Sequence, residues 1–184
     1  FEQIDMEVFK VDSLDVHGGS NRVYVKNKSN KKIQICASAE KAKQEEIVNG
    51  LDKLSTYLEF SDRVKRSKKD LVSLLKGLKE KGEKIVSYGA TSKSTTVFNY
   101  CGITTELIDH IVDTTPSKHY KHSPGTHIPV IPYSQDFKES TNYAFLGAWN
   151  YLEEITKKEG KYLLEGGKFI VHVPTVKSIG NEDE

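Results

Sequence analysis

The chain has 184 residues and a mass of 20.7 kDa, which suits one main core with appended elements rather than two full domains. Its 27 Lys and Arg residues are balanced by 26 Asp and Glu residues, so the formal net charge of +1 gives no case for nucleic acid or an anionic membrane as a partner. No apolar run is long enough to cross a membrane. We therefore expect a soluble protein.

Two further features of the sequence bear on location and completeness. Cys36 and Cys101 lie far apart and outside any Cys-x-x-Cys pair, which argues against a zinc ribbon or a disulfide scaffold and favours a reducing cytoplasm. Phe1 opens no signal peptide. Because the chain begins with phenylalanine rather than methionine, we expect it to be a piece of a longer protein.

The first residues predict an extended hairpin. Met6 to Val11 and Ser20 to Lys26 alternate apolar and polar residues, as half-buried strands do, and residues 15–20 lie between them as a turn. In this turn His17 precedes two glycines, where backbone comes close to a ligand, and its ordinary pKa of about 6.5 suits a general base near neutral pH. A structural or exposed turn histidine is the alternative, and spacing alone favours it.

A long helical segment and then an α/β pattern follow. Apolar residues recur at helical spacing from Ala39 to about Lys81, which predicts two helices or one long bent helix. After Gly82, short apolar runs alternate with helical stretches, as is typical of a parallel sheet with helices on both faces. The runs cover residues 84–88, 107–112, 128–131, 143–148 and 169–173. The predicted parts are residues 1–37 with the strands and linker, 38–82 with the helical segment, and 83–184 with the α/β domain.

One segment predicts an anion site. From Ile85 to Thr96 an apolar strand leads through a turn of small hydroxylated residues into a helix, whose first N–H groups and positive dipole end favour a phosphate. Lys93 adds a charge there. The turn has one glycine, Gly89, so it is not a dinucleotide fingerprint, and Ser92 stands where a Walker loop needs glycine. An ordinary turn with Thr91 or Ser92 as N-cap is an equally weighted alternative.

Other polar residues are expected at the same edge of the sheet. Because ligands bind outside the carboxyl ends of parallel strands, Tyr88-Gly89, Asp113 and Trp149-Asn150 should converge. Asp113 lies 24 residues after Gly89, close to where a Rossmann-type unit places the acid that accepts from ribose hydroxyls, although loop aspartates are common. Asn150 either presents its amide to a ligand or caps a helix that starts at Tyr151. His119, His122 and His127 have no cysteine beside them, so no metal site is expected.

Taken together, these segments resemble the C-terminal half of the bacterial sugar C-methyltransferase family, whose members methylate a carbon of a nucleotide-linked keto-sugar. The matching words occur in family order and span nearly the whole chain. They are His17-Gly18-Gly19-Ser20-Asn21-Arg22-Val23, Tyr88-Gly89-Ala90-Thr91-Ser92-Lys93, Asn99-Tyr100-Cys101-Gly102-Ile103, Pro124-Gly125-Thr126-His127-Ile128-Pro129, Trp149-Asn150 with Glu153-Glu154-Ile155, and Gly166-Gly167-Lys168-Phe169-Ile170.

The resemblance implies a Rossmann-like C-terminal domain that helps to hold the sugar nucleotide. In the family it follows an N-terminal zinc-binding lobe and a central domain that binds S-adenosylmethionine. The glycine-rich loop for that cofactor and the cysteine ligands for zinc are absent from this sequence. We therefore expect the cofactor to be bound by preceding N-terminal domains of the same protein, no cofactor in this fragment, and no methylation by the fragment alone.

The resemblance also implies roles for individual residues. It makes His17 the base that removes the proton from C3 of a 4-keto-deoxysugar, with dTDP as the expected nucleotide. Relatives carry a glutamate directly before this histidine, whereas Val16 stands here, so the nearest acid, Asp15, is the candidate for assisting the base. The expected substrate-binding residues are Tyr88, Gly89, Thr91, Ser92, Lys93, Ser94, Asp113 and Asn150. A non-catalytic nucleotide-sugar-binding module is the alternative function.

Overall fold

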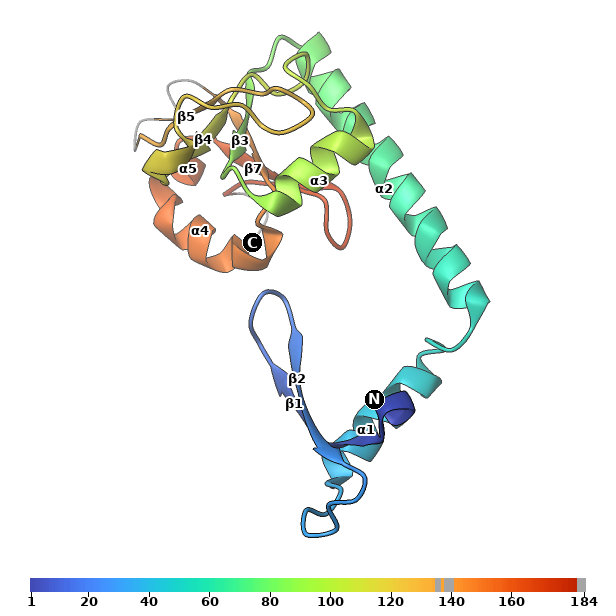
Figure 1. The fold of residues 1–184 in the computed structure, drawn as a ribbon. Coiled ribbons are helices and arrows are strands. Elements are labelled where there is room, and N and C mark those ends of the chain that lie inside the picture. Colours follow the sequence, from blue (N-terminus) through green and yellow to red (C-terminus); the bar gives the residue numbers. More distant parts are fainter. Residues whose placement is uncertain (135–136, 138–140, 182–184) are drawn as a thin grey trace. The chain divides into compact units, whose positions relative to one another are not determined.

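The computed structural model describes residues 1–134, 137 and 141–181. The chain divides into two compact units, Phe1–Asp62 and Arg63–Glu184. Figure 1 follows the chain from the first unit, in blue, to the second, in green through red.

The first unit is a hairpin followed by a helix. After a 3-10 turn, η1 (Glu2–Ile4), the strands β1 (Met6–Leu14) and β2 (Ser20–Asn27) pair antiparallel, with Leu14 opposite Ser20 beside the turn. The predicted strands are thereby confirmed. A linker then leads to α1 (Ala37–Val48), and the N–H of Cys36 donates to the carbonyl of Phe9 at 2.7 Å.

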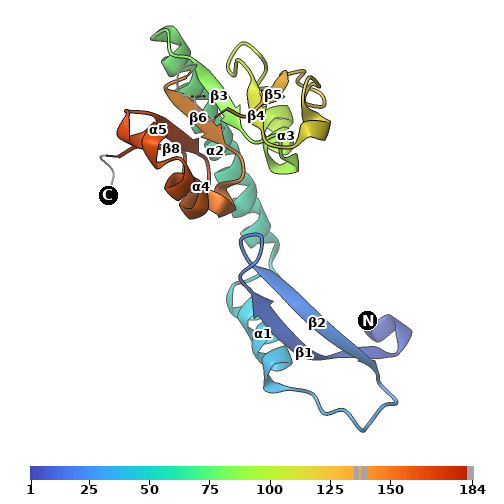
Figure 2. The ribbon, with the colours of Figure 1, turned by 90° about the vertical axis from the view of Figure 1, so that its left-hand side faces the viewer.

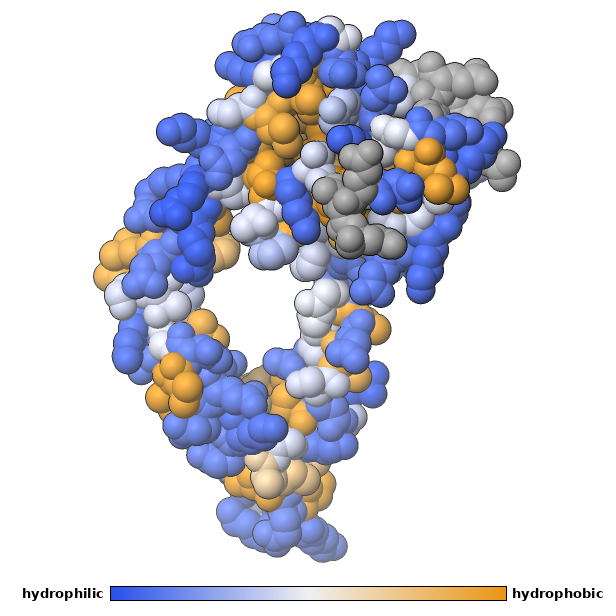
Figure 3. Space-filling view, turned by 180° about the vertical axis from the view of Figure 1, so that it is seen from behind, coloured by the Kyte–Doolittle hydropathy of each residue, from blue (hydrophilic) through white to orange (hydrophobic). Residues whose placement is uncertain are grey.

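The first unit has no apolar core of its own. Within residues 1–62, all of which the structure describes, no apolar side chain is buried. The buried side chain there is Lys26, whose Nζ lies 2.7 Å from Glu7 Oε1 and donates to the carbonyl of Asn30 at 2.9 Å. Large apolar residues are instead exposed, and Figure 3 shows such residues in orange on this unit. They include Ile4, Val16, Val23, Ile35, Ile47, Val48, Leu51, Leu54 and Leu58.

The second unit is built on a six-stranded sheet with strand order β5-β4-β3-β6-β7-β8. Five strands run parallel, and β8 pairs antiparallel with β7 at one edge. The strands are β3 (Ile85–Tyr88), β4 (Ile111–Asp113), β5 (Val130–Pro132), β6 (Tyr143–Leu146), β7 (Lys168–Val171) and β8 (Lys177–Ile179). This order places a topological switch point between β3 and β6, as in Rossmann-type sheets, and the predicted α/β fold is confirmed.

Helices cover both faces of this sheet (Figures 1 and 2). The sequence predicted two helices or one long bent helix from Ala39 to about Lys81. The structure has two, α1 and α2 (Leu54–Glu80), and α2 continues into the second unit. The other helical segments of the described second unit lie between its strands. They are α3 (Ser92–Cys101), α4 (Leu152–Lys158), α5 (Gly160–Leu164) and the 3-10 turns η2 (Pro116–Lys118) and η4 (Trp149–Tyr151).

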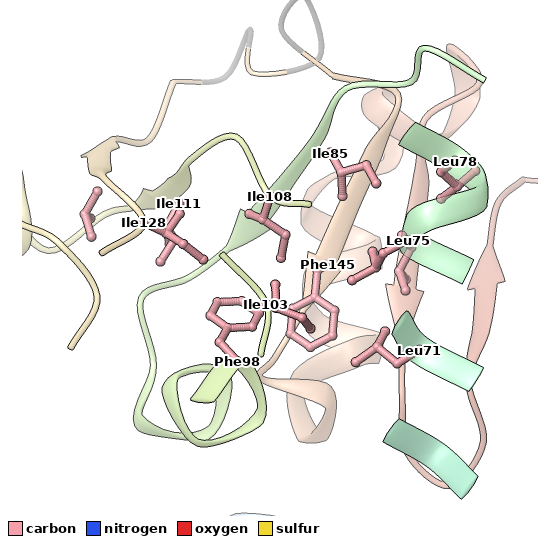
Figure 4. Packing of buried hydrophobic residues seen from close by; sticks show 12 residues of the cluster. Leu71, Leu75, Leu78, Ile85, Phe98, Ile103, Ile108, Ile111, Ile128 and Phe145 are labelled. Carbon is pink, nitrogen blue, oxygen red and sulfur yellow. The ribbon is translucent and has the colours of Figure 1, made fainter. Parts of the chain in front are cut away.

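Successive side chains along each strand point to opposite faces of the sheet. Ile85 and Phe145 belong to a cluster with Leu71 and Leu75 of α2 and Phe98 of α3, shown in Figure 4. Their neighbours in the strands pack on the other face against α4 and α5. That second cluster comprises Val86, Ala144, Leu146, Phe169 and Val171 with Phe137 and Tyr162.

Two half-buried histidines of the second unit, His110 and His172, each have a buried ring nitrogen without a hydrogen-bond partner among the described residues. His172 follows β7, and its ring stacks on Phe145 with centroids 5.5 Å apart. Neither His172 Nδ1 nor His110 Nε2 has a hydrogen-bond partner among the described residues. Burial lowers the pKa of both imidazoles, because charging them would leave a cation poorly solvated.

Protonation should therefore destabilise the fold. The pKa of His172 is lower in the folded state than the value of about 6.5 in the unfolded chain, so the unfolded state binds more protons and the free energy of unfolding falls as pH drops below about 6.5. His172→Phe keeps the ring stack and removes the titration. Urea melts at pH values on either side of 6.5 should show a smaller acid loss in this variant, while the exposed-site control His122→Phe keeps the wild-type loss. Equal losses in all three proteins would contradict this account.

Candidate functional site

The turn between β3 and α3 is closed by a capping box. Thr91 is the N-cap: its Oγ1 accepts from the N–H of Ser94 at 3.0 Å, and its own N–H donates to Ser94 Oγ at 3.1 Å. The prediction that Thr91 or Ser92 caps this helix is confirmed for Thr91. The hydroxyls of Thr91 and Ser94 are both engaged in the cap, and Ser94 is only 1% exposed. Ser92 and Lys93 form the first turn of the helix after the cap.

Gly89 and Gly147 allow the β3–α3 turn its backbone conformation and its close approach to the end of β6. Gly89 has a φ of +88°, a conformation that L side chains rarely adopt. Gly147, at the end of β6, lies so close to the helix start that a Cβ there would be 2.6 Å from Ser94 Cβ and 3.1 Å from its Cα. Gly147 was not predicted as a site residue, although it directly follows the apolar strand β6. The carboxyl end of β6 is thus in direct contact with the start of α3.

Asp113 fixes the same turn from the neighbouring strand. Its Oδ2 accepts from the N–H of Ala90 at 2.7 Å, and its Oδ1 accepts from the N–H of Thr115 at 2.7 Å. Lys118 Nζ lies 3.3 Å from Oδ2 and donates to the carbonyl of Ala90 at 2.9 Å. Burial opposes ionisation of Asp113, but these hydrogen bonds outweigh it and lower the pKa of the carboxyl. The carboxylate therefore ties the β3–α3 turn to the end of β4.

Lys93 meets the residues that follow β6. Its Nζ donates to Asn150 Oδ1 and lies 5.2 Å from the ring centroid of Trp149. The alternative role of Asn150 as a helix N-cap is wrong, because Trp149–Tyr151 form η4 and Tyr151 occupies the cap position of α4. The predicted convergence of Tyr88-Gly89, Asp113 and Trp149-Asn150 on one edge is therefore seen in these contacts. A substrate contact of each residue stays a prediction.

A pocket of about 300 Å³ opens at the carboxyl ends of β3 and β4, under α4. Tyr88, Gly89 and Asp113, which were predicted as site residues, line it. The rest of the lining was not predicted as part of a site. The additional residues are Val112, Thr114, Tyr133, Tyr151, Glu154, Ile155 and Lys158.

A buried carboxylate organises one wall of this pocket. Glu159 is 5% exposed and accepts from Tyr88 Oη at 2.7 Å and from Tyr133 Oη at 2.8 Å. Lys158 Nζ lies 3.3 Å from Glu159 Oε1, donates to Tyr88 Oη at 2.9 Å and lies 4.2 Å from the ring centroid of Tyr133. Burial and the carboxylate raise the pKa of Tyr88 and raise the pKa of Tyr133 to about 12. Both phenols therefore stay protonated and donate to Glu159.

One of these missed residues had a signal in the sequence. Tyr133 directly follows β5, and the rule that selected Asp113 at the end of β4 selects it equally. Glu159 had none, because an acid among lysines in a helical stretch looks like an ordinary solvated surface.

His17 lies at the tip of the β1–β2 hairpin in the first unit. Its φ is +56°, and those of Gly18 and Gly19 are also positive. The turn is held by the N–H of Gly19 and by Ser20 Oγ, which both donate to the carbonyl of Val16 at 3.1 Å. His17 and Asp15 are both exposed. The imidazole is thus presented at the surface of its unit.

No group of three or more His, Cys, Asp or Glu side chains among the described residues is arranged to hold a metal ion. None of the helices described has the length and apolar character needed to cross a bilayer.

Comparisons with known proteins place the chain in a family. Residues 15–174 match the family described as C-methyltransferase C-terminal domain. The chain is also 32% identical over 182 residues to "C-methyltransferase NovU" of Streptomyces niveus, an alignment that covers 99% of this chain and 43% of that relative. The chain thus spans less than half the length of the curated relative. On these matches, the chain belongs to the C-methyltransferase C-terminal domain family.

Proposed function

We propose that this chain is the C-terminal part of a methyltransferase that uses S-adenosylmethionine to methylate a carbon of a nucleotide-linked 4-keto-deoxysugar. The observation that carries the proposal is the turn at the carboxyl edge of β3, where Lys93 and the first turn of α3 meet Asn150. An anion is favoured at such a helix start. A chain of the C-methyltransferase family with this arrangement is suited to hold the diphosphate of a sugar nucleotide.

In this proposal some site residues face the diphosphate, and others hold the β3–α3 turn in place or line the adjoining pocket. The backbone of Ser92 and Lys93 and the Lys93 ammonium face the diphosphate, and Asn150 orients that ammonium. Thr91 and Ser94 act through the cap that sets the helix start, and Asp113 acts through its hydrogen bond to Ala90. Tyr88 and Gly89 line the adjoining pocket. We take dTDP as the nucleotide.

His17 is assigned the proton transfer. A ketone at C4 makes the neighbouring C3–H acidic, and a neutral imidazole removes that proton, leaving an enolate whose carbon then takes the methyl group. Presentation at an exposed hairpin tip gives the imidazole access to a substrate. Asp15, two residues earlier, is the candidate for assisting it. The assignment comes from the resemblance of the His-Gly-Gly-Ser turn.

S-Adenosylmethionine supplies the methyl group, and this chain does not fit it. The β3–α3 turn has a single glycine, Gly89, rather than the glycine-rich loop that this cofactor needs. We therefore assign cofactor binding to polypeptide that precedes these residues and derive no step of this chain's mechanism through the cofactor.

The first unit offers surface to that preceding polypeptide. A hairpin with one helix and no buried apolar side chain is at best marginally stable in water, so residues 1–62 need further contacts. The named relative is more than twice as long as this chain, since the alignment covers 43% of it. We propose that the N-terminal domains of the same protein cover the exposed apolar residues of this unit. Two free cysteines accord with a reducing cytoplasm as the location.

The base assignment predicts a specific loss in the full-length protein. His17→Asn keeps a residue that tolerates a positive φ but has no basic nitrogen, so turnover should fall by about 100-fold or more. Affinity for S-adenosylmethionine should stay nearly unchanged. Solvent-deuterium exchange at C3, measured without the methyl donor, isolates the proton transfer. Wild-type exchange in this variant would place the base elsewhere, and Asp15→Asn, run in parallel, tests the next candidate.

The diphosphate assignment predicts that Lys93 contributes to dTDP affinity. Lys93→Ala removes the ammonium at the helix start and should weaken dTDP binding to the 184-residue chain by about tenfold. Lys161→Ala removes a lysine whose side chain is 79% exposed and serves as the matched control. Calorimetric titration at two salt concentrations checks both, because screening should shrink the difference. Equal dissociation constants for wild type and Lys93→Ala would remove this lysine from the site.

A further inference from the structure

Lys93 differs from two nearby lysines in the charge of its partners. Lys118 Nζ lies 3.3 Å from Asp113 Oδ2, and Lys158 Nζ lies 3.3 Å from Glu159 Oε1. The charge of each of these ammonium groups is therefore largely offset by a carboxylate of the chain itself. Among the described residues, no carboxylate lies within ion-pair distance of Lys93 Nζ.

The contacts of Lys93 are with uncharged groups. Its Nζ donates to the amide oxygen Oδ1 of Asn150 and lies 5.2 Å from the ring centroid of Trp149. That separation is within the range of cation–π interactions, and an indole is the side chain whose face attracts a cation most strongly. An amide oxygen and a ring face hold an ammonium without cancelling its charge. The positive charge of Lys93 thus stays available to an anion.

The end of β6 brings Trp149 to this lysine. Gly147 directly follows β6, and a Cβ there would lie 2.6 Å from Ser94 Cβ. Because residue 147 has no side chain, the backbone after β6 runs close beside the first turn of α3. Trp149 follows two residues later in η4, and its side chain is half-buried. The indole is therefore placed beside α3 by the backbone of its own segment.

A lysine that binds an anion gains from such support. Its four-carbon stem is flexible, so fixing the ammonium against a ligand costs side-chain entropy. Contacts that hold the ammonium before the ligand arrives reduce this cost. Asn150 supplies one such contact by its hydrogen bond, and the ring of Trp149 supplies a second.

We propose that Trp149 is a positioning residue of the diphosphate site, whose indole face holds the Lys93 ammonium in place and leaves its charge for the ligand. Trp149 acts through Lys93 in this inference and is assigned no ligand contact of its own. The inference rests on the proposed function, because that function assigns Lys93 to the diphosphate.

The test measures binding of inorganic pyrophosphate to the 184-residue chain by calorimetry at low ionic strength. Trp149→Leu removes the ring and should weaken binding by about fivefold, whereas Trp149→Phe keeps a weaker ring face and should weaken it by about twofold. In a Lys93→Ala background, Trp149→Leu should cause no further loss, because a residue that acts through Lys93 then has no ammonium to hold.

A second lysine–aromatic pair supplies the matched control. Lys68 Nζ lies 4.9 Å from the ring centroid of Tyr100, which is near the far end of α3 from Lys93. Tyr100→Leu removes a cation–π contact outside the site and should leave the affinity for pyrophosphate unchanged. Circular dichroism checks that each variant is folded, and if Trp149→Leu does not fold, Trp149→Phe is compared in the two backgrounds instead.

The outcomes separate this inference from the diphosphate assignment. Equal weakening by Trp149→Leu in the wild-type and Lys93→Ala backgrounds overturns the inference alone, because the tryptophan then acts independently of the lysine. Wild-type affinity in folded Trp149→Leu also overturns it alone when Lys93→Ala weakens binding. Pyrophosphate that does not bind, or that binds equally well to Lys93→Ala, contradicts the diphosphate assignment and with it the inference.

Discussion

The hydrogen bond from the Ala90 N–H to the Asp113 carboxylate, 2.7 Å long, joins the turn after β3 to the end of the neighbouring strand β4. It holds the β3–α3 turn in place from one side, while the contact of Gly147 with Ser94 holds it from the other. Lys118 reinforces the first of these by bonding to both Ala90 and Asp113. A turn fixed in this way presents the start of α3 without further rearrangement, which is what a preorganised anion site requires.

The turn also divides two chemically different surfaces. On the α3 side lie a helix start and the Lys93 ammonium with Asn150, which favour negative charge. On the α4 side lie tyrosine rings whose hydroxyls are engaged by the Glu159 carboxylate, and the Lys158 ammonium is paired with the same carboxylate. The positive charge available to an anion is therefore on the α3 side. Both proposals concern how Lys93 is held there.

The sequence predicted the parallel strands and, before them, two helices or one long bent helix; in the strands and in α2, periodicity reports which side chains are buried. It did not predict β8, whose three residues run antiparallel at an edge and carry no buried run. At the site, capping by Thr91 followed from local chemistry, whereas the partners of Asp113 did not. Strand spacing predicted that Asp113 accepts from ribose hydroxyls. In the structure its carboxylate accepts from the N–H groups of Ala90 and Thr115, and these contacts depend on how the loops after β3 and β4 meet. The burial of Glu159 depends on tertiary packing in the same way.

The central claim is that the start of α3 and the Lys93 ammonium bind the diphosphate of a sugar nucleotide. Titration of the nitrogen-15-labelled 184-residue chain with dTDP, followed by amide chemical shifts, tests it most directly. The account predicts shifts at Ala90 and Lys93 and at the Trp149 indole N–H beside Lys93. Shifts confined to residues 1–62, or to the β7–β8 edge of the sheet, would contradict it.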